Sequence, residues 1–279
     1  MTDQDLYTRC KRAIAFVYEA PAVKGDEFPC IGQHPIATGF MFAIALKDRD
    51  VFYLLTNKHV LFEEKATQDV LILRTQMRGL RDTICVRLND PEDKKFVYQS
   101  IDLETEGLKK NVWQPNLESV DLVAIHIPLE GELNFAPASF TMDNLHNGST
   151  LSFGVGTAAC AIGYLSGYAG IEKNHPIVRF GRIAMTSSEQ WLSTERNFAI
   201  REQAYLAEFS AVGGASGSPV VLDFPERPDH PIIIGVVKSS MTSLNNELQG
   251  LVAIEPPMNL ADFVQQLKGE LSGRGMEVL

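Results

Sequence analysis

The stretch GGASGSPV, residues 213–220, places Ser216 among glycines and directly before an apolar run. In two other stretches a reactive polar residue likewise lies at one end of a run of residues that favour β-strands. YLLTNKHV, residues 53–60, brings His59 just beyond such a run, and SVDLVAI, residues 119–125, places Asp121 just before one. Short runs rich in β-branched and aromatic residues are typical of strands. The sequence therefore predicts three chemically reactive groups at the ends of three strands.

The residue types at these positions are those of acyl transfer. A serine hydroxyl is a weak nucleophile, so an imidazole must accept its proton as it attacks a carbonyl. The imidazole needs a carboxylate that fixes its tautomer and stabilises the cation that forms. The oxyanion needs preorganised donors, and Gly214, which has no Cβ, lets backbone N–H groups approach closely. We expect Ser216 as nucleophile, His59 as base, Asp121 as its orienting acid, and the N–H groups of Gly214 and Ser216 as the oxyanion hole.

The order of the three groups along the chain narrows the class further. His, then Asp, then Ser is the order of chymotrypsin, whereas subtilisin and the α/β-hydrolases use other orders. The nucleophile elbow is excluded because it needs glycine two residues after the serine, and position 218 is serine. His126, Asp102 and Ser210 have competing residue types but lack the flanking pattern, so we assign them structural roles.

The rest of the chain consists of short β-rich runs separated by turn residues, which favours a barrel or sandwich over alternating strands and helices. The predicted strands form two groups of about six, at residues 13–18, 38–46, 51–56, 70–75, 83–88, 96–100 and 122–127, and at 158–163, 177–186, 204–209, 220–222, 232–238 and 251–254. Residues 259–268 carry apolar side chains at helical spacing, so a C-terminal amphipathic helix is expected.

Together these segments resemble the trypsin-like (chymotrypsin-fold) serine peptidases, and most of all the bacterial HtrA/DegP-type and V8-like branches. YLLTNKHV resembles the HtrA strand that leads to the catalytic histidine, and AIGY, residues 161–164, resembles a strand and turn of the second barrel. GASGSP, residues 214–219, is similar to the serine motif of both branches, and Ser218 favours the V8 form. GLVAIEPPMN, residues 250–259, resembles the last strand before the terminal helix.

The resemblance implies an all-β fold of two six-stranded antiparallel β-barrels, chymotrypsin-like, with a C-terminal helix. Residues 1–140 would form the barrel that carries His59 and Asp121, and residues 141–279 the barrel that carries Ser216. One departure from the digestive enzymes and one from the HtrA-type proteases matter. Position 215 is alanine where they have aspartate, so the ion pair that activates their zymogens is not expected. We also expect no PDZ domain after the catalytic unit.

By the family's pattern the substrate pocket would be formed by residues on both sides of the serine motif. These are Ser210, Ala211, Val237, Lys238 and Ser240. They include no acid to attract arginine or lysine. Lys238 either attracts an acidic side chain or faces solvent, and we expect a small or medium uncharged residue at P1, the substrate residue before the cleaved bond.

Composition excludes several other functions. A net charge of -10 argues against nucleic-acid binding, which normally needs a basic face. The N-terminus lacks the pattern of a secretory signal, and no apolar run approaches the roughly 20 residues that span a bilayer. The cysteines (Cys10, Cys30, Cys85 and Cys160) lie far apart, which argues against a metal site or a disulfide framework. We expect a cytoplasmic enzyme without cofactor or metal.

The expected partners are a polypeptide substrate and, if activity is gated, a regulatory protein. An alternative function is also open. The same fold could bind peptides as a latent pseudo-protease, because Ala215 and the Gly213-Gly214 pair could leave the loop before the nucleophile poorly ordered.

Overall fold

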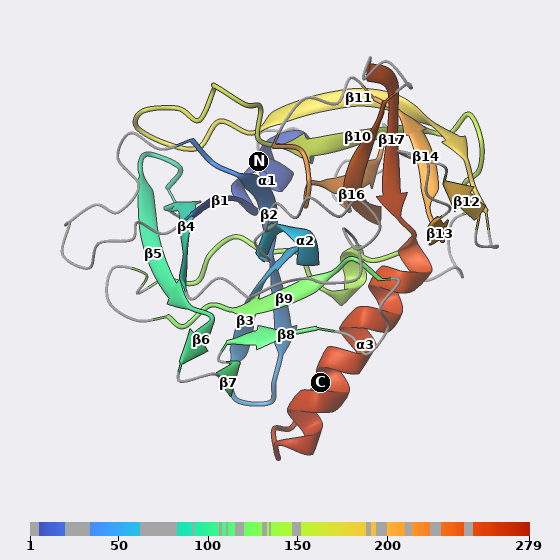
Figure 1. Ribbon diagram of the computed structural model, residues 1–279. Coiled ribbons are helices and arrows are strands. Elements are labelled where there is room, and N and C mark those ends of the chain that lie inside the picture. The colour runs from blue at the N-terminus through green and yellow to red at the C-terminus, as the bar shows by residue number, and fades with distance from the viewer. Residues whose placement is uncertain are drawn as a thin grey trace, which may run out of the picture.

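The computed structural model describes residues 6–19, 34–61, 83–90, 92–105, 108–109, 111–114, 120–129, 133, 135–146, 152–187, 191–193, 200–209, 214–223, 230–242 and 248–279. In this part of the chain two large β-sheets lie against each other, and a long C-terminal helix runs from the second sheet along the first (Figure 1). The strand predicted at residues 70–75 lies outside the described residues.

The first sheet has seven strands in the order β5-β4-β1-β2-β3-β9-β8, and all neighbours are antiparallel. They are β1 (Ile14–Glu19), β2 (Ala37–Ala45), β3 (Asp50–Thr56), β4 (Thr83–Asn89), β5 (Phe96–Asp102), β8 (Val112–Trp113) and β9 (Val123–His126). The sequence predicted a closed six-stranded barrel here. Among the described residues the sheet is open, with β5 and β8 as its edges. The two residues of β8 are too few to give β5 a continuous hydrogen-bond ladder.

The second sheet is the six-stranded barrel that the sequence predicts. It closes because β10 pairs with β11 on one side and with β15 on the other. Its strands are β10 (Ala158–Gly163), β11 (Ile177–Met185), β14 (Tyr205–Glu208), β15 (Pro219–Leu222), β16 (Ile233–Thr242) and β17 (Leu248–Glu255). Short strands form two further pairs, β6 (Glu104–Thr105) with β7 (Leu108–Lys109) and β12 (Trp191–Ser193) with β13 (Ile200–Glu202).

Several strands of both sheets, among them β1, β2, β10 and β15, bury both of their faces, which explains their nearly continuous apolar sequences. Successive side chains of a strand point to opposite faces. In β1, Ile14 and Phe16 belong to a cluster that also holds Ile162 of β10, so this cluster lies between the two sheets. Ala15 and Val17 of β1 belong to a second cluster inside the first sheet. A third cluster fills the closed barrel.

The helices are α1 (Leu6–Arg12), α2 (Lys58–Leu61), a 3₁₀ turn (Met142–Asn144) and α3 (Pro257–Gly273). The predicted C-terminal helix is confirmed and is longer than expected. It begins at Pro257, a position where the missing N–H of proline costs nothing. One face of α3 is buried, and the Phe263 ring meets Trp113 of β8 edge to face at 4.8 Å. The helix therefore docks on the first sheet although it follows the second.

A buried arginine also ties the two sheets together. Arg87 of β4 is 3% exposed, and its guanidinium lies 3.8 Å from the centre of the Phe96 ring. Nη1 donates to the Tyr18 hydroxyl at 3.1 Å, and Nη2 donates to the carbonyl of Gly170, in the segment between β10 and β11, at 2.9 Å. The Asn174 side chain donates to the Arg87 carbonyl at 2.8 Å. This network fixes the segment after β10 against the first sheet.

Three of the cysteines, Cys10, Cys85 and Cys160, are buried and form no disulfide among the described residues, while Cys30 lies outside those residues. Within the described ranges no helix is long and apolar enough to cross a membrane. The same ranges contain no group of three or more His, Cys, Asp or Glu side chains arranged to hold a metal ion.

The docking of α3 gives a prediction about stability. Phe263→Ala removes a fully buried ring and is expected to lower the free energy of unfolding by about 3–5 kcal/mol. Gln266→Ala, at an exposed position of the same helix, should change it by no more than about 0.5 kcal/mol. Urea denaturation followed by circular dichroism measures both. Equal, small effects would contradict the docking of α3.

Candidate active site

His59 and Asp121 meet because their strands are neighbours. His59 lies in α2, which directly follows β3, and Asp121 precedes β9. The β3–β9 ladder pairs Thr56 with Val123, so the end of one strand lies beside the start of the other. The Asp121 carboxylate accepts two hydrogen bonds from His59, at 2.7 Å from ring Nδ1 and at 3.1 Å from the backbone N–H. Since an ionised carboxylate only accepts, the proton of a neutral ring lies on Nδ1.

The two side chains differ in exposure, in a way that suits a base and its orienting acid. The Asp121 side chain is 13% exposed, whereas that of His59 is 46% exposed. Asn57 is fully buried and donates from Nδ2 to the Asp121 carbonyl at 2.8 Å, which fixes the backbone of the acid. Ring Nε2 of His59 has no hydrogen bond to any described residue. That nitrogen is therefore free to accept a proton.

Ser216 lies on a turn that leads into β15 of the closed barrel, and three backbone hydrogen bonds hold this turn. Thr38 N–H donates to the Ser216 carbonyl at 2.9 Å, Ser218 N–H to the Ala215 carbonyl at 3.0 Å, and Gly217 N–H to the Val237 carbonyl at 2.9 Å. The first of these comes from β2, in the other sheet. The turn is thus held from both halves of the molecule.

Thr38 is a site residue that the sequence analysis missed. It is completely buried, and its hydroxyl donates to the Gly214 carbonyl at 2.8 Å and accepts from Tyr164 N–H at 2.8 Å. The carbonyl of Thr38 accepts a hydrogen bond from the Thr56 hydroxyl at 2.7 Å. Thr56 precedes His59 by three residues. The sole signal in the sequence is a polar residue at the start of the apolar run TGFMFAIAL.

Two glycines of the turn have left-handed backbone conformations, Gly214 at φ 90° and Gly217 at φ 84°. Gly214 lies on the Tyr164 ring, where an added Cβ would be 2.3 Å from Cδ1. The Tyr164 carbonyl accepts from Arg179 Nη2 at 3.3 Å, and burial lowers the pKa of that guanidinium. The backbone path around Ser216 therefore depends on the absence of side chains beside it.

The hydroxyl of Ser216 donates to the Lys238 carbonyl over 3.5 Å, which is a weak hydrogen bond. Among the described residues, Ser216 Oγ makes no hydrogen bond with His59. Without a substrate, such catalytic hydrogen bonds are often long or poorly aligned. The backbone N–H groups of Gly214 and Ser216 find no acceptor within the described chain.

The predicted pocket residues are only partly described. Ser210 and Ala211 lie outside the described residues, while Val237 is buried, Lys238 is half-buried and Ser240 is exposed, all on β16. Lys238 does not simply face solvent: its side chain is 13% exposed and Nζ lies 3.8 Å from Oε2 of Glu255.

Of the three residues that the sequence analysis set aside, Asp102 and His126 make structural contacts, while Ser210 lies outside the described residues. Asp102 accepts from the Thr83 hydroxyl at 3.1 Å on the first sheet. The His126 ring lies 5.7 Å from that of Tyr53, between β9 and β3.

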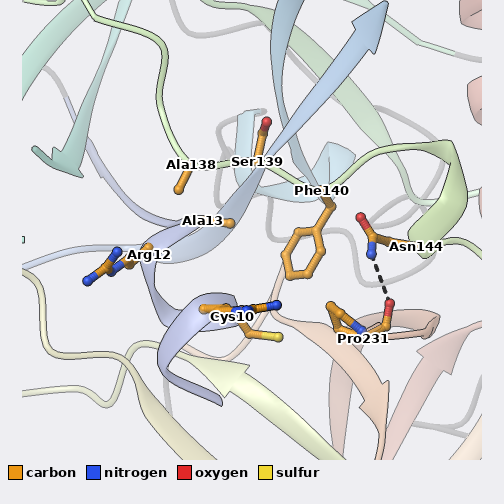
Figure 2. A pocket seen from close by; sticks show the side chains of 9 residues that line it. Cys10, Arg12, Ala13, Ala138, Ser139, Phe140, Asn144 and Pro231 are labelled. Carbon is orange, nitrogen blue, oxygen red and sulfur yellow. Dashed lines mark hydrogen bonds between the residues drawn. The ribbon is translucent and has the colours of Figure 1, made fainter. Parts of the chain in front are cut away.

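A cavity of about 320 Å³ lies elsewhere, between α1 and the segment that contains Phe140 (Figure 2). The Phe140 side chain projects beside Ala13 and Pro231, and Asn144 Nδ2 donates to the Pro231 carbonyl at 3.1 Å. None of the candidate catalytic residues lines this cavity, so the functional argument rests on the surface around Ser216.

No family model matches this chain, and neither does any curated protein. Solved structures do match it. The active form of the Rv3671c protease from M. tuberculosis superposes with a TM-score of 0.52 at 13% identity, over 93% of this chain and 82% of that one. The inactive form of the same protease superposes with a TM-score of 0.49 at 13% identity, over 94% of this chain and 91% of that one. On the match to the active form, this chain has a chymotrypsin-like fold, as the sequence predicted.

The conformation of Gly217 gives a second prediction. In Gly217→Ala the new Cβ would lie 1.9 Å from the Thr38 carbonyl oxygen, at a backbone φ that alanine rarely adopts. We expect the free energy of unfolding to fall by about 2 kcal/mol or more. Gly154→Ala has open space within 4 Å and should change stability by no more than about 1 kcal/mol. If chemical denaturation gave equal values for the two variants, the close packing of the turn on Thr38 would be wrong.

Proposed function

We propose that this chain is a serine endopeptidase of the trypsin-like class, in which Ser216, His59 and Asp121 form the catalytic triad. The observation that carries the proposal is the double hydrogen bond from His59 to the Asp121 carboxylate, with ring Nδ1 2.7 Å from Oδ2. This geometry fixes the ring and leaves Nε2 to act as base. The chymotrypsin-like fold supports the assignment, because Ser216 lies on the turn that directly precedes β15 (Pro219–Leu222) of the closed barrel.

The proposed mechanism is acyl transfer to water. Ser216 Oγ attacks the peptide carbonyl while Nε2 of His59 takes its proton, and Asp121 stabilises the resulting imidazolium. The N–H groups of Gly214 and Ser216 hold the oxyanion. The intermediate collapses as His59 passes the proton to the leaving amine. Water then attacks the acyl-enzyme, His59 again accepts a proton, and the acid product leaves as Ser216 recovers its hydrogen.

For substrate preference we propose a small or medium uncharged residue at P1. The one cation among the described pocket residues, Lys238, is paired with Glu255 and is therefore not offered to an acidic side chain. A cleavage profile over a peptide library dominated by Arg, Lys or Glu at P1 would contradict this preference. The motifs around His59 and Ser218 support a place near the HtrA/DegP-type and V8-like branches. The described cysteines, which form no disulfide, suit a reducing compartment such as the cytoplasm.

A latent or peptide-binding protein of the same fold is the second candidate. It is favoured by the Ser216 hydroxyl, which donates to Lys238 and not to His59. In this case a partner would have to reorganise the site before catalysis. The two candidates differ in their reaction with a fluorophosphonate, which needs an activated serine.

The triad assignment predicts the outcome of labelling and kinetics. Wild-type protein is expected to be labelled by a fluorophosphonate probe at Ser216, and Ser216→Ala to abolish both labelling and peptide cleavage. Asp121→Asn should lower kcat by about 10⁴-fold, because the ring loses its productive tautomer. Ser218→Ala is the matched control, since the buried Ser218 hydroxyl makes no hydrogen bond with any residue of the described part of the chain. No labelling of wild type, with or without candidate partners, would favour a binding protein.

A further inference from the structure

Glu255 is a buried carboxylate directly behind the proposed triad. It ends β17, just before Pro256 and α3, and its exposure is 0%. Its Oε2 accepts from the backbone N–H of Asp121 at 3.1 Å and lies 3.8 Å from Nζ of Lys238. Its Oε1 accepts from Nδ2 of Asn259, in the first turn of α3, at 2.5 Å. Groups from three separate segments thus converge on one side chain.

A carboxylate at such a place is costly, since a buried charge loses its hydration and is usually paired. Burial raises the pKa of Glu255, while Lys238, the amide of Asn259 and the N–H of Asp121 act to lower it. A buried apolar side chain would avoid this conflict. The apolar run LVAI directly before Glu255 has such residues in the same strand. The position therefore favours a role for the carboxylate beyond packing.

The partners of Glu255 are connected to all three proposed catalytic residues. Asp121, whose N–H binds Glu255, holds His59 through its own carboxylate. Lys238, which pairs with Glu255, accepts the hydroxyl of Ser216 at its carbonyl. Because Asp121 belongs to the first sheet and Lys238 to the second, Glu255 links the acid and the nucleophile across the boundary between them.

We propose that Glu255 is a positioning residue for the reaction: it holds the backbone of Asp121 in place and offsets the charge of Lys238 behind the triad. This inference rests on the proposed peptidase function. Glu255 does not contact the substrate, so it acts through Asp121 and Lys238.

The charged groups that face Glu255 are Lys238 on β16 and Asp121 before β9, while Asn259 on α3 is neutral. Removal of the Glu255 charge would take away the carboxylate that lies 3.8 Å from the Lys238 ammonium, and so strengthen the positive field near Asp121. A cation there opposes formation of the His59 imidazolium, which the reaction requires. The acid side of the pH profile of kcat/KM should then move to lower pH, and kcat should fall.

Three variants separate the two parts of this role. Glu255→Gln keeps an oxygen that can accept from Asp121 N–H but loses the charge, and we expect kcat to fall about tenfold. Glu255→Ala loses both the accepting oxygen and the charge, and we expect kcat to fall about a hundredfold. KM should change less than twofold in each. The double variant Lys238→Met with Glu255→Gln removes both charges and should return the acid limb of kcat/KM toward its wild-type position. Glu270→Gln, exposed on α3, is the matched control for loss of one negative charge.

A measurement that needs no activity completes the test. Amide hydrogen exchange of Asp121, followed by NMR in a Ser216→Ala background, should be about as slow in Glu255→Gln as in the parent, and at least tenfold faster in Glu255→Ala. Equal exchange in all three would overturn the proposal, as would an acid limb of kcat/KM that does not move in Glu255→Gln. If the exchange behaves as expected but wild-type protein neither cleaves peptides nor reacts with a fluorophosphonate, the contact stands and the proposed peptidase function fails.

Discussion

The hydroxyl of Thr38 is the contact on which the arrangement of the site depends. It is completely buried, donates to the Gly214 carbonyl and accepts from the N–H of Tyr164. The backbone of the same residue binds Ser216 through its N–H and Thr56 through its carbonyl. One residue of β2 thus holds the nucleophile's turn beside the strand that leads to His59. A valine of similar shape would leave the N–H of Tyr164 buried without an acceptor, a loss worth about 1–3 kcal/mol.

This contact in turn requires residues without side chains next to it. A Cβ at Gly217 would lie 1.9 Å from the Thr38 carbonyl oxygen, and one at Gly163 would lie 1.9 Å from the Ser218 hydroxyl and 2.8 Å from that of Thr38. The glycines therefore set how closely the second barrel approaches β2. Since His59 and Asp121 lie on the first sheet and Ser216 on the second, this approach decides whether the three groups can act together.

The sequence predicted the parts of this structure that depend on local pattern. Alternating and continuous apolar runs gave the strands of the closed barrel, and apolar spacing gave α3. The polar residues at the strand ends gave His59 and Asp121, which the β3–β9 ladder brings together. Contacts between segments that lie far apart in the chain leave weaker signals in the sequence. Glu255 resembles an ordinary acid before two prolines, and its hydrogen bond with Asp121 joins residues that lie far apart in the chain. The open edge of the first sheet also depends on tertiary packing. The same is true of the Lys238 side chain, which lies beside Glu255.

The hydrogen bonds of the turn around Ser216 indicate how much of the candidate active site would have to move before a reaction. The backbone around Ser216 is tied at the carbonyls of Ala215 and Ser216 and at the N–H of Gly217, by bonds of 2.9–3.0 Å. The side chain, in contrast, is held by one hydrogen bond of 3.5 Å to Lys238. A rotation of the hydroxyl about the Cα–Cβ bond, on this backbone, therefore costs about a rotamer change and a weak hydrogen bond, roughly 1 kcal/mol. Binding of a substrate readily supplies that much, so the contact with Lys238 is too weak to count against Ser216 as the proposed nucleophile.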